Sequence, residues 1–432
     1  MQKKVSTLNK PLNGKIIIPA DKSLSHRAVM FSALAKGKSI IRNFSDGQDP
    51  LTTLKIFNQL GVECEIKENE IVIKSNGILK QSATHLDCGN SGTTMRLISG
   101  ILAGQKFDSV LIGDESLSKR PMKRIIEPLT QMGAIIESNE YKAPLKITGQ
   151  ELHAIDYTSQ IASAQVKSCI LLAGLGVGVN NIGGRNGITS VTEPYLSRNH
   201  TELMLKAMGA NITTNGTKVS IQKSELAPIE IDICGDISSA AYFIVAALIV
   251  PNSKVILKNV GLNPTRTGIL DVAQKMGANI QILDEKEVCG EKVGDIQIEY
   301  SQLKGCEISG EIIPRLIDEI PVIAVLATQA KGQTIIKDAQ DLRNKESDRI
   351  TAVVTELKKL GANIEETPDG MVICGRDKLL GGCEVETYHD HRLAMSLYVA
   401  GLICEKEILI NGFEWVDISF PTFEELFITL NK

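Results

Sequence analysis

Residues 87–96 combine small polar side chains and two glycines with the apolar run 97–102 that follows them. This order predicts a loop that leads into the N-terminus of a helix. Such an end carries unpaired backbone N–H groups and a partial positive charge, and Gly89 and Gly92 leave the backbone open to a ligand. The segment is therefore a candidate anion site, although an ordinary Ser/Thr N-cap beside a turn explains the same residues equally well.

Positively charged residues recur close to predicted helix starts and in the loops between helices. They are Lys22, Arg27, Arg96 and Arg392 near helix starts, and Lys119, Arg120, Arg198, Lys345 and Arg349 in loops. A cation at a helix N-terminus opposes the helix dipole and costs free energy unless an anion binds. Solvated surface charge accounts for most of the 47 basic residues, but repeated placement in a repeated unit indicates a cleft for a polyanion.

Two acidic residues stand out within this basic set. Asp318 lies in an apolar context, and Glu346 follows Lys345 directly. Either residue could be a helix N-cap or an ion-pair partner. A carboxylate that is desolvated but flanked by cations could instead stay ionised and act as a base, with its neighbour as proton donor. The residues alone do not decide between these roles.

The elements that must position these residues repeat along the chain. Five times a helical segment ends in Leu-Gly or Met-Gly, at Gly61, Gly133, Gly209, Gly277 and Gly361. Glycine just after a helix adopts the left-handed conformation at low cost, so the segments that follow, such as 62–66, 210–214 and 362–366, are predicted strands. Upstream lie predicted strands 39–42, 109–112, 179–182, 254–257 and 333–336, each preceded by a helix that starts at Asp21, Asn90, Ser163, Asp236 or Asp318. A sixth copy begins at His389 and runs through strand 407–410 to helix 423–430.

Six units in 432 residues give 72 residues each, the size of a βαβαββ module. We expect an α/β protein of two domains with three modules each. The chain ends before the sixth unit has its last strands, so strand 15–18 is predicted to complete it. The predicted domains are residues 20–228 and residues 1–19 plus 229–432. Two crossovers would form a hinge, and a ligand cleft that closes between hinged domains is expected.

Composition limits the function further. Apolar residues make up 43% of the chain and aromatic residues 4%, which favours sheets covered by helices. The net charge is −4 with both signs mixed, which argues against a nucleic-acid or anionic-membrane surface. Nine scattered cysteines indicate free thiols in a reducing compartment, without a disulfide or zinc site. No apolar run has the length of a signal peptide or a membrane span, so we expect a cytoplasmic protein.

Eight ordered motifs across the whole chain resemble the 3-phosphoshikimate 1-carboxyvinyltransferase (5-enolpyruvylshikimate-3-phosphate synthase) family of the shikimate pathway. They are residues 21–27, 89–96, 119–122, 163–167, 198–202, 263–266, 345–349 and 390–392. The resemblance implies two domains of three βαβαββ units, an inside-out α/β barrel. It also implies transfer of the enolpyruvyl group of phosphoenolpyruvate to the 5-hydroxyl of shikimate 3-phosphate, through a tetrahedral intermediate and with release of phosphate. No metal or organic cofactor, nucleic acid or membrane partner is implied, and a monomer is expected.

The resemblance also assigns residues to the two substrates. The shikimate 3-phosphate site resembles Lys22, Ser23, Arg27, Ser163, Ala164, Gln165, Arg198, Asp318 and Lys345. The phosphoenolpyruvate site resembles Lys22, Asn90, Gly92, Arg120, Gln165, Arg349 and Arg392. Asp318 and Glu346 resemble the acid/base pair, with Lys22 assisting. Two phosphates and two carboxylates explain why the site uses guanidinium forks and ammonium groups.

The chain departs from the family pattern at a few positions. Ala20 stands where many members have glycine or serine, Ala164 stands where some have a second serine, and Ile418 stands where some members place a lysine. Motifs 163–167, 198–202 and 263–266 resemble the subclass with lower sensitivity to glyphosate, while Gly92 leaves room for that inhibitor. The competing enzyme is the enolpyruvyl transferase that acts on UDP-N-acetylglucosamine, but the loop 113–120 lacks the cysteine usual there. A non-catalytic, anion-binding repeat scaffold is the alternative from another class.

Overall fold

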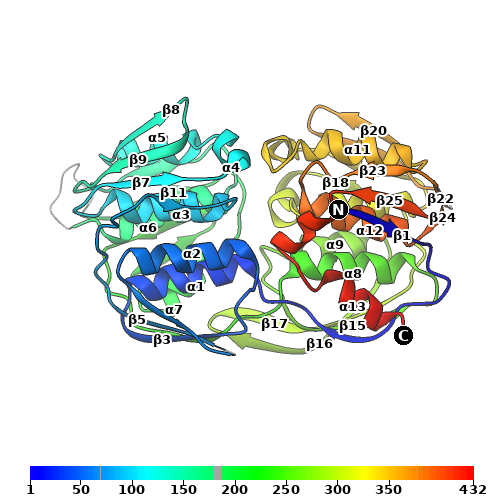
Figure 1. Ribbon diagram of the computed structural model, residues 1–432, viewed down its shortest axis with the longest axis horizontal. Coiled ribbons are helices and arrows are strands. Elements are labelled where there is room, and N and C mark those ends of the chain that lie inside the picture. Colours follow the sequence, from blue (N-terminus) through cyan, green and yellow to red (C-terminus); the bar gives the residue numbers. More distant parts are fainter. Residues whose placement is uncertain (69, 179–185, 377) are drawn as a thin grey trace. The chain divides into compact units, whose positions relative to one another are not determined.

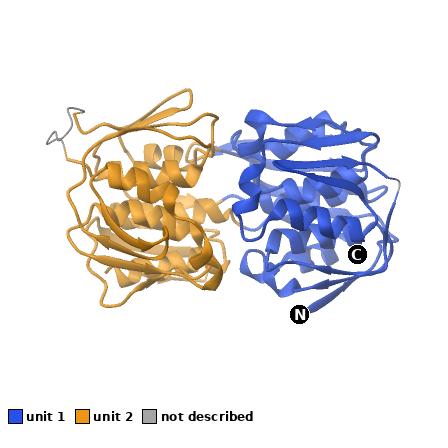
Figure 2. Cartoon of the chain, turned by 90° about the horizontal axis from the view of Figure 1, so that it is seen from above, with its two compact units in different colours: residues 1–19, 234–287, 292–432 blue, residues 20–233, 288–291 orange. Residues whose placement is uncertain are grey.

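The computed structural model describes residues 1–68, 70–178, 186–376 and 378–432. The chain forms two compact units (Figure 2). Unit 1 contains Met1–Pro19, Cys234–Glu287 and Lys292–Lys432, and unit 2 contains Ala20–Ile233 and Val288–Glu291. Elements are labelled in Figure 1. The predicted strand at residues 179–182 lies outside the described residues.

Among its described residues, unit 2 holds three four-stranded sheets of one design. In spatial order they are β14 (Glu230–Asp232), β3 (Lys36–Arg42), β5 (Glu70–Asn76), β4 (Glu63–Ile66); β6 (Leu86–Asp87), β7 (Ser109–Ile112), β9 (Lys142–Thr148), β8 (Ile135–Asn139); and β10 (Asp156–Thr158), β11 (Thr189–Thr192), β13 (Lys218–Ile221), β12 (Ile212–Asn215). In each sheet the first pair is parallel and the other two pairs are antiparallel. The repeated topology confirms the predicted modules.

Unit 1 repeats the design with one variation. Its sheets are β2 (Asn13–Ile17), β15 (Lys254–Gly261), β17 (Glu291–Glu299), β16 (Asn279–Val288); β18 (Glu307–Ile308), β19 (Gln333–Ile336), β21 (Gly370–Cys374), β20 (Asn363–Thr367); and the shorter β23 (Glu384–Glu386), β25 (Ile408–Asn411), β1 (Gln2–Val5), with β22 (Leu379–Gly381) paired to β24 (Cys404–Lys406). The antiparallel strand β1 fills the place that the chain end leaves open in the last of these sheets.

Two strands exchange partners between the modules, and this corrects the sequence prediction. Strand β2 precedes the first helix of unit 2, but it pairs in parallel with β15 of unit 1. Strand β14 precedes the first helix after the second crossover, but it pairs in parallel with β3 of unit 2. The strand predicted at 15–18 therefore does not complete the sixth unit; β1 does. For the same reason residues 229–233 lie in unit 2, beyond the boundary predicted at residue 228.

Helices line the sheets in each unit. Unit 2 has α1 (Lys22–Leu34), α2 (Gln48–Gln59), α3 (Gly92–Ala103), α4 (Glu115–Lys119), α5 (Lys123–Gln131), α6 (Ala164–Leu175) and α7 (His200–Ala207). Unit 1 has α8 (Ile237–Ile249), α9 (Gly268–Lys275), α10 (Ile320–Thr328), α11 (Arg349–Lys359), α12 (His391–Gly401) and α13 (Phe423–Leu430), with 3₁₀ turns η1 (Gly310–Arg315), η2 (Gln340–Asn344) and η3 (Phe413–Ile418). All nine residues of α10 are buried, as expected of a helix that is apolar on every side.

Local signals fixed where most helices begin and end. The five glycines predicted to follow helices all have a positive φ, from 84° at Gly61 to 95° at Gly133 and Gly277. Side chains of Asp21, Ser91, Ser163, Asp236 and Asp390 cap five of the predicted helices, and two of these caps, Ser91 and Asp390, lie one residue after the predicted starts at Asn90 and His389. The exception is α10, where the N-cap is Glu319 and no side chain caps the helix. Asp318 is therefore left to other partners.

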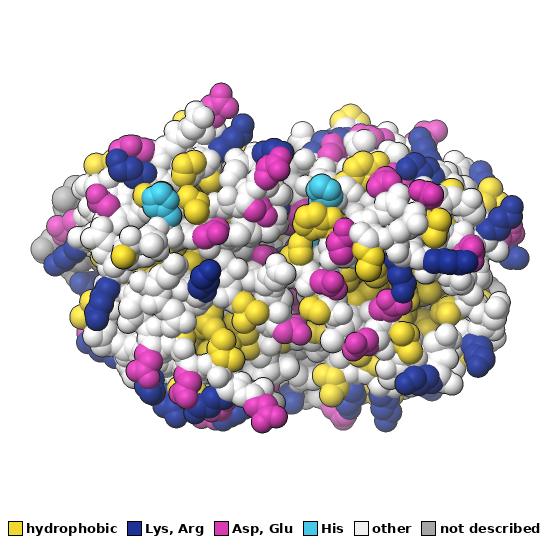
Figure 3. Space-filling view, in the orientation of Figure 1, with side chains coloured by type: hydrophobic (Ala, Val, Ile, Leu, Met, Phe, Trp, Pro, Cys, Tyr) yellow, Lys and Arg dark blue, Asp and Glu magenta, His cyan; other side chains and the backbone are white. Residues whose placement is uncertain are grey.

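The charge distribution on the surface and the state of the cysteines can be compared with the expectations from composition. On the face shown in Figure 3, basic and acidic side chains are interspersed within each unit. All nine cysteines are free thiols. Among the described residues, no helix has the length and apolar character needed to cross a membrane.

Candidate functional site

The predicted site residues fall into two groups, one in each unit. Unit 2 holds Lys22, Ser23, Arg27, Asn90, Gly92, Arg120, Ser163, Ala164, Gln165 and Arg198. Unit 1 holds Asp318, Lys345, Glu346, Arg349 and Arg392.

The start of α1 supplies two cations and a serine in unit 2. Lys22 is the first residue of the helix, and its Nζ lies 3.3 Å from Oδ2 of Asp49. Arg27 is buried one turn further on and donates from Nη1 to the carbonyl of Ser23 at 2.9 Å. Its Nε donates to Oγ1 of Thr201 at 2.7 Å, so the guanidinium ties α1 to α7. Lys22 is thus the more exposed of the two cations.

The start of α3 is the loop-to-helix junction predicted at residues 87–96. Ser91 caps the helix by accepting a bond from Thr94 N at 3.2 Å. Asn90 is held by Arg120, whose Nη2 donates to Oδ1 of Asn90 at 2.8 Å. A Cβ added to Gly92 would lie 3.0 Å from Nη1 of Arg96 and 3.5 Å from Nη1 of Arg120. Glycine therefore keeps the backbone accessible between two guanidinium groups.

The start of α6 lies beside that of α3. Gln165 accepts from Nη1 of Arg96 at 2.6 Å and donates from Nε2 to Oγ1 of Thr93 at 3.0 Å. The two helices approach closely because Gly100 has no side chain: a Cβ there would lie 2.1 Å from the carbonyl oxygen of Cys169. Backbone N–H groups of two helix starts and the side chains of Arg96 and Arg120 thus converge in one region of unit 2.

Arg349 is the centre of the group in unit 1. It is the first residue of α11 and is 1% exposed. Its guanidinium donates to three carboxylates: Oδ2 of Asp390 at 2.7 Å, Oε2 of Glu346 at 2.6 Å and Oδ1 of Asp318 at 3.4 Å. The pKa of Arg349 is raised: burial alone would lower it, but Asp390 and Glu346 outweigh burial. The guanidinium therefore stays charged.

Asp318 lies among three cations of unit 1. Oδ1 is 3.7 Å from Nζ of Lys345 and 3.4 Å from Nη1 of Arg349, and Oδ2 is 4.0 Å from Nη2 of Arg392. The pKa of Arg392 is raised, because Asp318 and other nearby groups outweigh the effect of burial. Asp318 is therefore an ion-pair partner of all three cations.

Sequence reasoning missed the carboxylate that holds Arg349. Asp390 is fully buried, and its pKa is lowered: burial would raise it, but the charge of Arg349 prevails. It also caps α12 through a bond from Arg392 N to Oδ1 at 2.9 Å. Asp390 directly precedes His391 and Arg392 in the motif at residues 390–392. Its polar neighbours are typical of a helix cap and do not indicate a contact with Arg349.

The motif at residues 263–266 forms a structural link. Arg266 is 2% exposed and donates from Nη2 to Oδ1 of Asp236 at 3.2 Å and to Oγ of Ser238. Both partners lie at the start of α8. The motif therefore braces that helix start.

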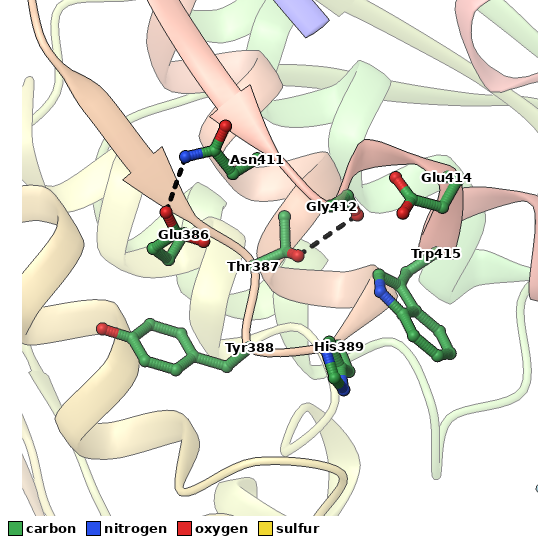
Figure 4. A pocket seen from close by; sticks show the side chains of 8 residues that line it. All are labelled: Glu386, Thr387, Tyr388, His389, Asn411, Gly412, Glu414 and Trp415. Atoms are coloured by element: carbon green, nitrogen blue, oxygen red, sulfur yellow. Dashed lines mark hydrogen bonds between the residues drawn. The ribbon is translucent and has the colours of Figure 1, made fainter. Parts of the chain in front are cut away.

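A pocket of unit 1 lies next to Asp390 in sequence but contains none of the predicted site residues. It has a volume of about 520 Å³ and is lined by Glu386, Thr387, Tyr388, His389, Asn411, Gly412, Glu414 and Trp415 (Figure 4). Its carboxylates already have partners: Glu386 accepts from Asn411 at 2.6 Å, and Glu414 accepts from the Met1 amino group at 2.5 Å. The ring of His389 stacks on Trp415 with centroids 4.7 Å apart. The lining of this pocket therefore adds no residue to the two groups of predicted site residues.

Comparisons with known proteins identify the family of the chain. A family profile described as EPSP synthase (3-phosphoshikimate 1-carboxyvinyltransferase) matches residues 7–427. The 3-phosphoshikimate 1-carboxyvinyltransferase of Bacillus cereus (strain G9842) is 51% identical over 427 residues, covering 98% of this chain and 97% of that protein. The protein of the same name from Bacillus subtilis (strain 168) is 51% identical and covers 98% of each chain.

Solved structures give the same result. EPSP synthase from Acinetobacter baumannii is similar with a TM-score of 0.87 and 44% identity, over 99% of this chain and 98% of that one. The enolpyruvyl transferase NikO from Streptomyces tendae has a TM-score of 0.79 at 15% identity, over 99% of this chain and 96% of that one, which supports the fold alone.

Proposed function

The chain belongs to the EPSP synthase (3-phosphoshikimate 1-carboxyvinyltransferase) family, and from that premise we propose which residues hold each substrate and which move protons. The enzyme transfers the enolpyruvyl group of phosphoenolpyruvate to shikimate 3-phosphate in aromatic biosynthesis. The reaction with UDP-N-acetylglucosamine is not favoured, because the curated relatives and the family profile share the shikimate activity.

We propose that shikimate 3-phosphate is bound by Lys22, Ser23, Arg27, Ser163, Ala164, Gln165, Arg198, Asp318 and Lys345. Phosphoenolpyruvate is bound by Lys22, Asn90, Gly92, Arg120, Gln165, Arg349 and Arg392. The observation that carries the assignment is the pair of cation-rich groups, one at the starts of α1, α3 and α6 and one around Asp318. Each charge-assisted contact contributes roughly 1.5–3 kcal/mol. The two substrates together carry two phosphates and two carboxylates, so the cations of both groups are needed to bind them.

In the proposed addition step, the oxygen of the 5-hydroxyl bonds to C2 of phosphoenolpyruvate. The hydroxyl gives up its proton, and C3 takes up a proton and becomes a methyl group. We assign the base to Asp318, because three cations within 4.0 Å keep it ionised. The other proton-transfer groups are Glu346 and Lys22. Glu346 accepts a bond from the guanidinium of Arg349, as Asp318 does. In the elimination step the methyl group loses a proton, the bond from C2 to the phosphate oxygen breaks, and phosphate leaves.

We also propose the setting in which the enzyme works. Free thiols at all nine cysteines support a reducing compartment, the cytoplasm. The residues proposed for both substrates all belong to one chain, which supports a monomer, and a molar mass near 46.9 kDa in solution would establish it. Units 1 and 2 correspond to the two expected three-module domains, with the boundary moved to Ile233 by strand β14.

Reaction in deuterated water tests the addition–elimination route. Because C3 receives a solvent proton and then loses one of its three hydrogens, the enolpyruvyl product should contain deuterium at its vinyl carbon. Mass spectrometry measures this incorporation. A product without deuterium would contradict the route, and the absence of any product would contradict the activity.

A further inference from the structure

Helix α6 carries a lysine that is completely buried. Lys167 is 0% exposed, and its Nζ lies 2.9 Å from Oε2 of Glu193 and 2.8 Å from Oε1 of Glu202. A buried charge is costly unless it is paired, and here two carboxylates pair with one ammonium. Burial would lower the pKa of Lys167, but Glu202 and Glu193 together raise it. The three groups therefore form a charged cluster inside unit 2.

Glu193 reaches beyond this cluster to two segments of the substrate site. Its Oε1 accepts a bond from the backbone N of Ser163, the N-cap of α6, at 2.8 Å. Its Oε2 accepts from Oγ of Ser197 at 2.8 Å and from the backbone N of Ser197 at 3.4 Å. Ser197 directly precedes Arg198 in the chain. One carboxylate thus holds the start of α6 and the segment that leads to Arg198.

Glu202 provides an internal comparison. It lies on α7 and is buried like Glu193, with 5% and 3% exposure respectively. Both carboxylates face the same ammonium at almost the same distance. Among the contacts of the described residues, however, Glu202 reaches neither Ser163 nor Ser197. A role in charge balance is common to both residues, but a link to the site belongs to Glu193.

We propose that Glu193, fixed in place by Lys167, is a positioning residue for shikimate 3-phosphate. It sets the distance between the backbone N–H groups at the start of α6 and the guanidinium of Arg198. This inference rests on the proposed function, in which Ser163 and Arg198 bind that substrate. Gln165 has its own contacts to Arg96 and Thr93, so the phosphoenolpyruvate side should depend on Glu193 much less.

The matched variants Glu193→Gln and Glu202→Gln test the proposal. Each removes one negative charge from Lys167 at constant shape, so both should lower the melting temperature by a similar amount. The two variants differ in one respect. In Glu193→Gln, an amide NH₂ group, which is a donor, replaces a carboxylate oxygen that accepts bonds from Ser163 or Ser197. We expect Glu193→Gln to raise the KM for shikimate 3-phosphate about tenfold, with kcat and the KM for phosphoenolpyruvate changed less than threefold. Glu202→Gln should leave all three constants within about twofold.

Two further measurements keep the test decisive. If Glu193→Gln does not fold, Ser197→Ala removes one bond to Glu193 while the ion pairs remain, and we expect about a threefold rise in the same KM. Equal KM changes in the two glutamine variants, no change in either, or a loss confined to kcat would overturn the inference. Wild-type protein is assayed alongside the variants. If the wild type does not consume the two substrates, the proposed function itself is contradicted. If the wild type is active and the variants have the same kinetic constants as the wild type, only the positioning role is contradicted.

Discussion

The guanidinium of Arg349 meets the carboxylate of Asp390 through two bonds, from Nε to Oδ2 at 2.7 Å and from Nη2 to Oδ1 at 3.3 Å. Their side chains are 1% and 0% exposed. The pair joins the first residue of α11 to the N-cap of α12, the helix whose second residue is Arg392. One buried carboxylate therefore holds the guanidinium of Arg349 and caps the helix that carries Arg392, the other cation of unit 1 proposed to bind phosphoenolpyruvate.

Replacing Asp390 with asparagine should disturb the guanidinium of Arg349. A buried pair that loses one partner costs about 3–5 kcal/mol, and the neutral amide recovers part of this because it keeps the cap. We expect a loss of about 3 kcal/mol in the free energy of unfolding and a fall in kcat/KM of at least about a hundredfold. Denaturant unfolding and steady-state kinetics measure the two effects.

Asp348→Asn is the matched control for that prediction. Asp348 is the N-cap of α11, and its carboxylate pairs with Arg343, which has no proposed role in binding. Its loss should reduce stability by about 1 kcal/mol and leave kcat/KM within about threefold. Equal kinetic effects of the two substitutions would contradict the account of Arg349 and Asp390.

Asp318→Asn should abolish turnover in a folded protein. The amide cannot accept the hydroxyl proton, so we expect kcat to fall by at least about a thousandfold, with little change in melting temperature. Asp341→Asn is the control, because Asp341 also pairs with Lys345, at 3.4 Å, but is not assigned a proton transfer. Wild-type turnover in Asp318→Asn would remove this residue from the mechanism.

Gly92→Ala should weaken phosphoenolpyruvate binding while the fold remains intact. The new methyl group would lie 3.0 Å from Nη1 of Arg96, so guanidinium groups or ligand must shift. Alanine favours the helix, and we expect unchanged or slightly higher stability with a KM for phosphoenolpyruvate raised about tenfold. Gly104→Ala at the other end of α3 meets only Leu152, at 3.6 Å, and should leave KM unchanged. Equal KM values for Gly92→Ala and wild type would refute the prediction.

His26 should make the protein less stable in mild acid. It is fully buried, and its pKa lies well below 6.5 because burial, then Lys22 and Arg27, disfavour the charged form. The unfolded chain then binds more protons than the folded one below pH 6.5, so this group's contribution is complete above about pH 6.5 and is lost as the pH falls. Melting temperatures between pH 7.5 and 5.5 should decrease more steeply for wild type than for His26→Gln. Parallel curves would show that His26 is not responsible.

The sequence predicted the elements that depend on local signals. The stop at Gly361 and the helix start at Ser163 follow from the conformational freedom of glycine and from a side chain that accepts a nearby N–H bond, so they need no knowledge of distant residues. Strand 109–112 was likewise predicted with the bounds of β7. These signals lie within a few residues of the feature that they specify.

Features that depend on distant partners could not be predicted in this way. Strands β2 and β14 each lie shortly before a helix in the sequence, and only the sheet pairings show that they exchange places between the units. The sequence around Asp390 is typical of a helix cap. Its second role, as the partner of the Arg349 guanidinium 41 residues away, is seen only in the structure. A lysine is usually exposed, so the burial of Lys167 could be inferred only from its ion pairs with Glu193 and Glu202.

Release of inorganic phosphate is the most direct test of the central claim. Purified protein would be given shikimate 3-phosphate and phosphoenolpyruvate together and each substrate alone, and the product would be weighed by mass spectrometry. The account predicts release only with both substrates, and a product heavier than shikimate 3-phosphate by one enolpyruvyl group. Release from phosphoenolpyruvate alone, or none with both substrates, would contradict it.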